Sequence, residues 1–186
     1  MTPESEAVRE VIDLFFEFGS STYDEGVTLT EHCLQTAALA ERDGAPPALV
    51  AAALLHDIGH LLQAKARGNE DYLVSDWAHD TVAADWLSPR FGAQVGEPVR
   101  HHVSAKRWLC QAEPGYVEQL SGASVASLEA QGGTFSLEQA NRWKSLPGTD
   151  EAVALRRWDD AGKVAGLTLR PLESYVALLD QMTLRR

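Results

Sequence analysis

The sequence predicts an all-α fold, and two features of its residue pattern carry this prediction. Apolar residues recur at helical spacing through most of the chain, whereas alternating runs rich in β-branched residues are nearly absent. Glycine and proline separate the helical stretches, and the pairs Gly132-Gly133 and Pro147-Gly148 are expected to form turns. With 186 residues the chain is long enough to build its own core, so we expect a single domain spanning 1–186.

Most of the expected helices have a local reason for their limits. The second ends before Gly44, the third begins with Pro47 in its first turn, and the fourth is stopped by Pro89. The sixth is expected to break near Gly122, and the seventh and eighth lie on either side of the Pro-Gly turn. The expected helices are 4–18, 29–43, 47–63, 76–88, 93–104, 114–131, 136–145, 149–160 and 171–184.

The composition narrows the classes of function. Hydrophobic residues make up 45% of the chain and charged residues 23%, and no apolar run approaches the ~20 residues of a membrane span. Because the N-terminus lacks the apolar core of a signal peptide and two cysteines make no disulfide framework, we expect a cytoplasmic protein. The 27 acidic residues outnumber the 16 basic ones, and a net charge of -11 argues against a nucleic-acid surface. We therefore expect a small-molecule partner, no nucleic acid, no membrane, and a monomer or homodimer.

Residue types that commonly bind metals recur at several places in the helical sequence. All six histidines lie between residues 32 and 102, most of them beside apolar positions. A single histidine on a helix is more often a hydrogen-bonded structural residue, but imidazoles together with carboxylates are the ligand set of divalent transition metals. The sequence therefore predicts a metal site. The stretches concerned are EHCLQTA, LLHDIGH, DWAHDTVAADWL, VRHHVSAKRW and LRRWDDAGK.

The segment LLHDIGH, residues 54–60, favours a site for two metals. His56 and His60 stand four residues apart and are expected on one face of helix 47–63, whereas Asp57 would point about 100° away from His56. A carboxylate has two oxygens and can ligate two ions, so the His-Asp pair suits a dinuclear site bridged by Asp57. The alternative is a capping or surface aspartate. The apolar neighbours disfavour it, because an unpaired buried carboxylate is costly.

The order of these residues resembles the HD-domain superfamily, in which a histidine precedes a His-Asp pair and a distant aspartate. In this chain they are His32, His56-Asp57 and Asp159. More narrowly, TEHCLQTAALA, AALLHDIGH, DWAHDTVAADWL, HVSAKRWL, LSGASVASLEAQGG and RRWDDAGK together resemble the PhnZ-type phosphonate oxygenases, from about Tyr23 to Gly162. The resemblance implies a helical bundle with a dinuclear site in its core, two iron ions in a mixed-valent Fe(II)/Fe(III) state, and dioxygen as cosubstrate.

The same resemblance implies a set of metal ligands. They would be His32, His56, Asp57, His79, His102 and Asp159. His102 is preferred to its neighbour His101 because it leads into the VSAKRW motif, and Asp159 is preferred to Asp160 because it forms the WD pair. For each ligand, the alternative is an ordinary surface residue.

The resemblance also implies substrate contacts. The phosphonate oxygens would be held by His60, Lys106, Ser124 and Arg156. Solvated surface charge is the alternative for the two basic side chains, and a helix cap is the alternative for the serine. Tyr23 and Glu25 match a lid before the first ligand helix, in which the tyrosine occupies an iron until substrate displaces it and the glutamate meets a substrate ammonium group. An exposed loop without a role is the alternative for Glu25.

The implied reaction is oxidative cleavage of the C-P bond of a 1-hydroxy-2-aminoethylphosphonate or its N-methylated analogue, giving phosphate and glycine or N-methylated glycine. Trp77, Trp108 and Trp158 stand beside the motifs and favour an aromatic cage for a methylated ammonium, with core packing as their alternative. Two rival functions use the same residues. One is an HD-type phosphohydrolase acting on a small phosphate ester, and the other is a catalytically silent binding module stabilised by metal.

Overall fold

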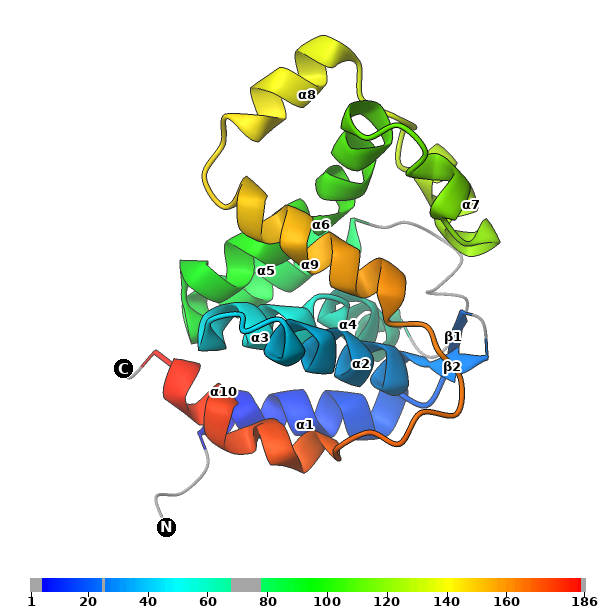
Figure 1. Ribbon diagram of the computed structural model, residues 1–186. Helices are drawn as coiled ribbons and strands as arrows, with labels where there is room; N and C mark the ends of the chain where they lie inside the picture. Colours follow the sequence, from blue (N-terminus) through cyan, green and yellow to red (C-terminus); the bar gives the residue numbers. More distant parts are fainter. Residues whose placement is uncertain (1–4, 25, 68–77, 185–186) are drawn as a thin grey trace.

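A computed structural model describes residues 5–24, 26–67 and 78–184, which are built mainly of helices (Figure 1). The predicted all-α class is confirmed, with one short antiparallel pair of strands before the second helix. The elements are α1 (Glu6–Phe18), β1 (Thr22–Asp24), β2 (Val27–Thr28), α2 (Leu29–Arg42), α3 (Pro47–Leu55), α4 (Ile58–Arg67), α5 (His79–Phe91), α6 (Ala93–Ala112), η1 (Val117–Gln119), α7 (Gly122–Ala130), α8 (Leu137–Lys144), α9 (Thr149–Ala161), η2 (Leu172–Tyr175) and α10 (Val176–Met182). Among the described residues, none of the helices has both the length and the apolar character needed to cross a bilayer.

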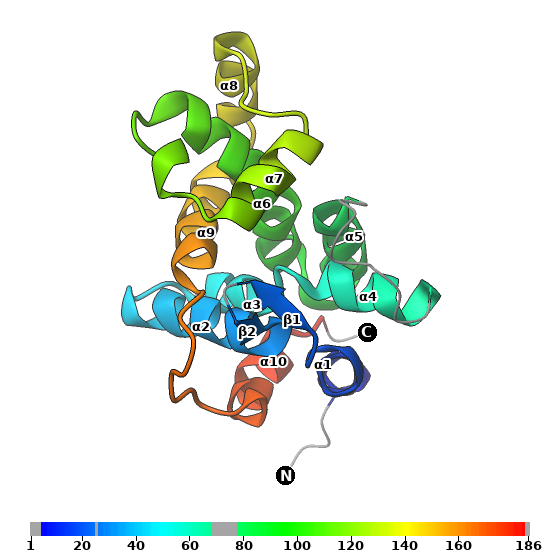
Figure 2. The same cartoon turned by 90° about the vertical axis from the view of Figure 1, so that its right-hand side faces the viewer.

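Helix α3 lies at the centre of the molecule. Every side chain from Leu49 to Leu55 is buried, because α2, α6, α9 and α10 all pack against this helix. Its run Ala51 to Ala53 lets neighbouring helices approach closely. Figures 1 and 2 show α1 and α10 on one side of the α2–α3 pair and α5, α6 and α9 on the other. The C-terminal end of α3, which leads into His56, therefore points into the core.

The start of α2 is fixed by a capping box. The Thr28 backbone N–H donates to Glu31 Oε2 at 2.7 Å, and the Glu31 N–H donates to Thr28 Oγ1 at 3.1 Å. Such reciprocal bonds satisfy two of the N–H groups that a helix start leaves unpaired. Because His32 follows Glu31 directly, this cap sets the position of the first histidine.

The expectation of one continuous helix over 47–63 is wrong. α3 ends at Leu55 and α4 begins at Ile58, so His56 and Asp57 occupy a turn between two helices. In an unbroken helix the two side chains would diverge by about 100°. The turn instead directs the side chains of His56 and Asp57 toward the same centre. There the buried Asp57 carboxylate contacts the imidazoles of His56 and His79.

Several other helix limits also differ from the prediction. α5 runs through Pro89 to Phe91, because a proline so near the end of a helix removes only one of its last hydrogen bonds. α6 extends to Ala112, well beyond the expected end at 104. The expected helix 114–131 is reduced to η1 and α7, with the break at Gly122 as expected. The predicted starts at 4 and 76 lie outside the described residues.

Candidate metal centre

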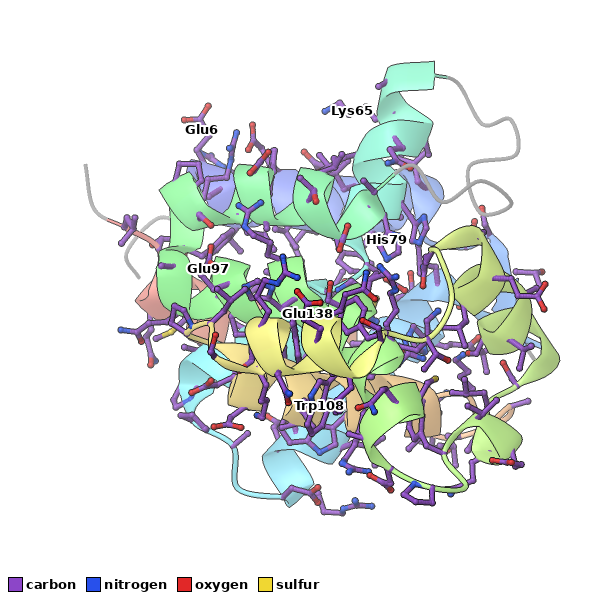
Figure 3. All side chains as sticks on the ribbon, turned by 90° about the horizontal axis from the view of Figure 1, so that it is seen from above. Glu6, Lys65, His79, Glu97, Trp108 and Glu138 are labelled. Atoms are coloured by element: carbon purple, nitrogen blue, oxygen red, sulfur yellow. The ribbon has the colours of Figure 1, made fainter. Side chains whose placement is uncertain are left out.

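Five segments far apart in the sequence bring the six expected metal ligands together in the core. α2 carries one histidine, the α3–α4 turn carries the His-Asp pair, and α5, α6 and α9 each add one residue. All six side chains are buried. Figure 3 labels His79, the first residue of α5. The residues brought together are His32, His56, Asp57, His79, His102 and Asp159.

One group of four possible metal-ligand atoms includes Oδ2 of Asp57. This oxygen lies 3.4 Å from His56 Nε2 and 3.7 Å from His32 Nε2. The Nε2 atoms of His32 and His56 are 3.1 Å apart, and Oδ1 of Asp159 lies 3.3 Å from Nε2 of His32. Two imidazole nitrogens and two carboxylate oxygens therefore converge on one small volume.

A second group forms around the other oxygen of the same carboxylate. Asp57 Oδ1 lies 3.5 Å from His79 Nε2 and 3.8 Å from His102 Nε2. The two imidazole nitrogens are 3.1 Å apart. His60 Nε2 is 4.0 Å from Oδ1, and the His60 ring stacks on His79 with ring centres 4.1 Å apart. The Asp57 carboxylate thus faces a different pair of histidines with each oxygen.

Backbone carbonyls orient three of the imidazoles. Nδ1 of His32 donates to the Gly162 carbonyl at 2.9 Å, that of His56 to Ala53 at 2.8 Å, and that of His102 to Val99 at 2.6 Å. A histidine whose Nδ1–H is held in this way presents the lone pair of Nε2 inward. These bonds fix the tautomer that a metal ligand requires.

The donor set fits a metal ion in each group. Asp57 Oδ2 and Asp159 Oδ1 are buried without a hydrogen-bond partner, and a buried anionic oxygen needs a cation. Imidazole nitrogens and the Asp57 carboxylate also form two triads, and the ligand atoms of each triad lie within 4.8 Å of one another. The triads are His32, His56 and Asp57, and Asp57, His60 and His79. Such mixed nitrogen and oxygen sets suit iron, manganese or zinc.

Electrostatics in the metal-free protein agree with strong attraction for cations. Burial would raise the pKa of Asp57, but His56, His60 and His79 hold that pKa well below its usual range. Burial alone would lower the pKa of His56, but Asp57 and Asp159 raise it to about 9. Burial and the neighbouring imidazoles lower the pKa of His102 to about 3. The two carboxylates thus stabilise a proton on His56, and a bound metal would take the place of that proton.

The two alternative ligands lie outside the groups. His101 is partly buried. Its Nε2 lies 3.8 Å from Glu97 Oε2, and its ring packs edge-on against Trp143. Asp160 accepts from Tyr116 and from Arg156 instead of facing the histidines. The structure therefore places His102 and Asp159 at the centre.

Buried basic side chains lie beside the metal centre. Lys106 is only 2% exposed and donates from Nζ to Ser127 Oγ at 2.6 Å. Arg156 is 5% exposed, and its Nη1 lies 2.7 Å from Oδ2 of Asp159. Solvated surface charge is therefore excluded for both side chains. The cap of α7 is Ser121, so the buried Ser124 does not serve as the helix cap.

Lys163 is a buried cation that the sequence motifs did not indicate. It lies just after α9, and its Nζ donates to Ser124 Oγ at 3.0 Å. Gln35 fixes the chain beside it, because its amide accepts from the Val164 N–H at 2.9 Å and donates to the Val164 carbonyl at 3.0 Å. The available signal was its place in RRWDDAGK, four residues after Asp159.

The lid and the expected aromatic cage have less support. Glu25, Trp77 and the side chain of Tyr23 lie outside the described part of the chain. Trp158 packs in the main core and donates from Nε1 to Asp43 at 2.8 Å. Trp108, labelled in Figure 3, packs in a separate small cluster, where its ring centre lies 6.0 Å from that of Trp143. Core packing, the alternative reading of these two tryptophans, is thus what the structure shows.

Comparison with known proteins places this geometry in a family. The HD domain family model matches residues 29–160. The chain is 44% identical to a hydroxymethylphosphonate dioxygenase of Gimesia maris over 170 residues, which are 91% of this chain and 85% of the relative. The chain belongs to the PhnZ-type HD-domain oxygenases. A second relative in this family is a [1-hydroxy-2-(trimethylamino)ethyl]phosphonate dioxygenase (glycine-betaine-forming) of Leisingera caerulea, 35% identical over 91% of this chain and 86% of its own.

Proposed function

We propose that this HD-domain oxygenase cleaves the C-P bond of a small 1-hydroxyphosphonate with dioxygen and releases inorganic phosphate. The observation that carries the proposal is the Asp57 carboxylate, whose two oxygens face separate histidine pairs beside buried basic side chains. Both dioxygenase relatives carry substrate names with a hydroxyl on the carbon that bears phosphorus. We infer that the whole chain, 1–186, acts as one domain on a small molecule in the cytoplasm, as a monomer or homodimer without nucleic acid or membrane.

Charge explains why a phosphonate dianion would bind here. The segments that build the centre carry three basic side chains and three carboxylates, whose formal charges cancel, and Arg156 contacts two of these carboxylates directly. Positive charge from bound metals is then left to attract a dianion, and the basic side chains supply directional donors. The basic residues are Lys106, Arg156 and Lys163, and the carboxylates are Asp57, Asp159 and Asp160.

Each polar residue would have a distinct task in the reaction. Lys106, Lys163 and Ser124 would hold phosphonate oxygens, and His60 would donate to one of them from beside the second metal position. Arg156 keeps Asp159 in place through its bond to Oδ2, and its buried Nε has no hydrogen-bond partner, which suits a substrate oxygen. Tyr23 and Glu25 are proposed to cover the substrate from the lid.

The metals would be two iron ions in a mixed-valent state. Iron supplies the redox chemistry that activates dioxygen, which zinc lacks. For hydroxymethylphosphonate the balance is one substrate and one dioxygen giving formate, phosphate and a proton. The substrate then supplies every electron that dioxygen accepts, so no further reductant is required.

The shape of the pocket decides which substituent on carbon 1 of the substrate is accepted. The relatives' names differ there, one lacking an amine and the other carrying a trimethylammonium group. Since Trp108 and Trp158 pack elsewhere, we propose that hydroxymethylphosphonate is a substrate at least as good as the trimethylammonium compound. Competition between the two at equal concentration, read as the ratio of kcat/KM, measures this preference.

The function is tested by loading metal-free protein with Fe(II) or with Zn(II) and measuring phosphate release. The assay includes hydroxymethylphosphonate, 2-amino-1-hydroxyethylphosphonate, its trimethylammonium analogue and the phosphate ester p-nitrophenyl phosphate. We expect release from at least one phosphonate with iron and none with zinc. Hydrolysis of the ester by both metal forms, with no phosphonate cleaved, would assign the chain to the phosphohydrolases. Metal binding without turnover of any compound would make it a binding module.

A further inference from the structure

Gly59, the fourth residue of HDIGH, lies where α4 meets the first residue of α5. A Cβ at this position would stand 2.0 Å from the carbonyl oxygen of His79, 2.8 Å from its carbonyl carbon and 3.1 Å from its Cα. All three atoms belong to the backbone, so no side-chain rotation can relieve the contact. Any residue with a Cβ would have to push the two helices apart by about an ångström.

This close approach lies directly beside the second metal group. His79 begins α5 directly after Ala78, a non-glycine residue in the left-handed region with φ of 54°. Its ring lies nearly parallel to that of His60, the neighbour of Gly59, at an interplanar angle of 20°. The Nε2 of His79 reaches Asp57 Oδ1 at 3.5 Å from this position. A shift of the His79 backbone would therefore separate the imidazole from the bridging carboxylate.

The first metal group does not depend on this contact. His32 comes from α2 and is held by the Gly162 carbonyl, and His56 is held by the Ala53 carbonyl within its own segment. Asp159 comes from α9, where Arg156 fixes its second oxygen. None of these anchors lies on α5. Apart from the shared Asp57, the ligands of the two metal positions are thus anchored on different parts of the fold.

We infer that Gly59 is a positioning residue for the second metal alone, and that its missing side chain is what makes the centre dinuclear. The inference rests on the proposed two-metal function. With a methyl group at this position the protein would bind one metal, at the group formed by His32, His56, Asp57 and Asp159. The second position would lose His79 while keeping His102 and the adjacent His60.

The test compares Gly59→Ala with the wild-type chain by metal content after anaerobic loading with Fe(II) and desalting. We expect about two ions per wild-type chain and about one per variant chain, since losing one ligand weakens a site by at least ~10–100-fold. Loading with Mn(II) gives a second readout, because electron paramagnetic resonance distinguishes an exchange-coupled pair from an isolated ion. His79→Ala should give the same single-ion state.

A matched glycine serves as the control. Gly122 is also helical, but a Cβ there would meet nothing within 4 Å, so Gly122→Ala should keep about two ions. The double variant Gly59→Ala/His79→Ala should bind as much metal as either single variant, because both act on the same ligand. Circular dichroism of each variant reports whether the helices are intact.

Three results would overturn the inference. Gly59→Ala could retain two coupled ions, it could lose both ions together, or it could lose its helical signal along with its metals. The last two would show that the contact serves the whole fold. A wild-type chain that binds a single ion would instead refute the proposed dinuclear function, whatever Gly59→Ala does.

Discussion

Oδ1 of Asp57 lies 3.5 Å from Nε2 of His79, while the other oxygen of the same carboxylate faces the separate group around His56. This division of one carboxylate explains why histidine and aspartate stand next to each other at the α3–α4 turn. A single-metal site would need only one of the two oxygens. The arrangement therefore favours a bridged pair of metals.

Replacing the bridge should remove metal from the protein. Asp57→Ala is expected to lower iron content from about two ions per chain to about one or none, and to abolish phosphonate cleavage, because both groups lose an anionic ligand. Metal analysis after anaerobic loading measures the change. Asp85→Ala is the matched control, since Asp85 is exposed and pairs with Arg100. Two ions retained in Asp57→Ala would show that this carboxylate does not bridge.

Removal of a buried cation should weaken substrate binding without emptying the metal centre. Lys106→Ala is expected to raise KM by roughly 10-fold to 150-fold, as for the loss of a charge-assisted contact of about 1.5–3 kcal/mol. Steady-state kinetics with the preferred phosphonate, together with metal analysis, gives both quantities. Lys65→Ala removes an exposed lysine and should leave both unchanged. Unchanged kinetics in Lys106→Ala would remove this lysine from the substrate site.

Lys163 should behave like Lys106, although it belongs to a different segment. Lys163→Met keeps the length of the side chain but removes the donor to Ser124, so KM is expected to rise at least about tenfold while metal content stays constant. Gln35→Ala provides an independent check, because it frees the chain at Val164 without touching the lysine. If neither variant changes KM, Lys163 has a structural role only.

Metal binding should release protons at neutral and mildly alkaline pH. In the metal-free protein the pKa of His56 is raised to about 9, so this imidazole is protonated at pH 7.5, whereas a metal ligand must be neutral. Calorimetric titration with Mn(II) in buffers of different ionisation enthalpy should show about one proton released from this residue. No dependence on the buffer would mean that His56 is already neutral.

The same pKa sets the pH dependence of stability in the metal-free protein. Because the folded pKa of His56 exceeds its unfolded value, its contribution is complete below the unfolded pKa of about 6.5 and is lost as pH rises through about 9. Denaturant unfolding of the metal-free chain should therefore give a lower free energy at pH 9.5 than at pH 7. His56→Asn should flatten this dependence in the same pH interval.

The sequence predicted the chemistry of the site better than its local backbone. All six expected ligands meet in the core, because residue type and the order of motifs identify a donor set wherever the chain brings it. The break at His56 could not be read from the sequence, since the run from Ala48 to Leu62 is apolar enough for one buried helix.

Residues that act through tertiary contacts were the ones missed. Lys163 follows a helix end in a polar stretch, and only its bond to Ser124 connects it with the proposed substrate site. Trp158 stands next to a ligand, yet its indole faces Asp43 because neighbouring residues of a helix point in different directions. Gly59 carries no side chain to interpret, and its role depends on a backbone from another helix.

The most direct measurement of the central claim is the ratio of dioxygen consumed to phosphate released by the iron-loaded protein. An oxygen electrode and a phosphate assay on the same reaction with hydroxymethylphosphonate, or with whichever phosphonate the substrate panel shows to be cleaved, provide both quantities. We predict about one dioxygen per phosphate, and no phosphate once oxygen is removed, because dioxygen accepts the electrons released when the C-P bond is oxidised. Phosphate release that continues at the same rate without oxygen would contradict the account.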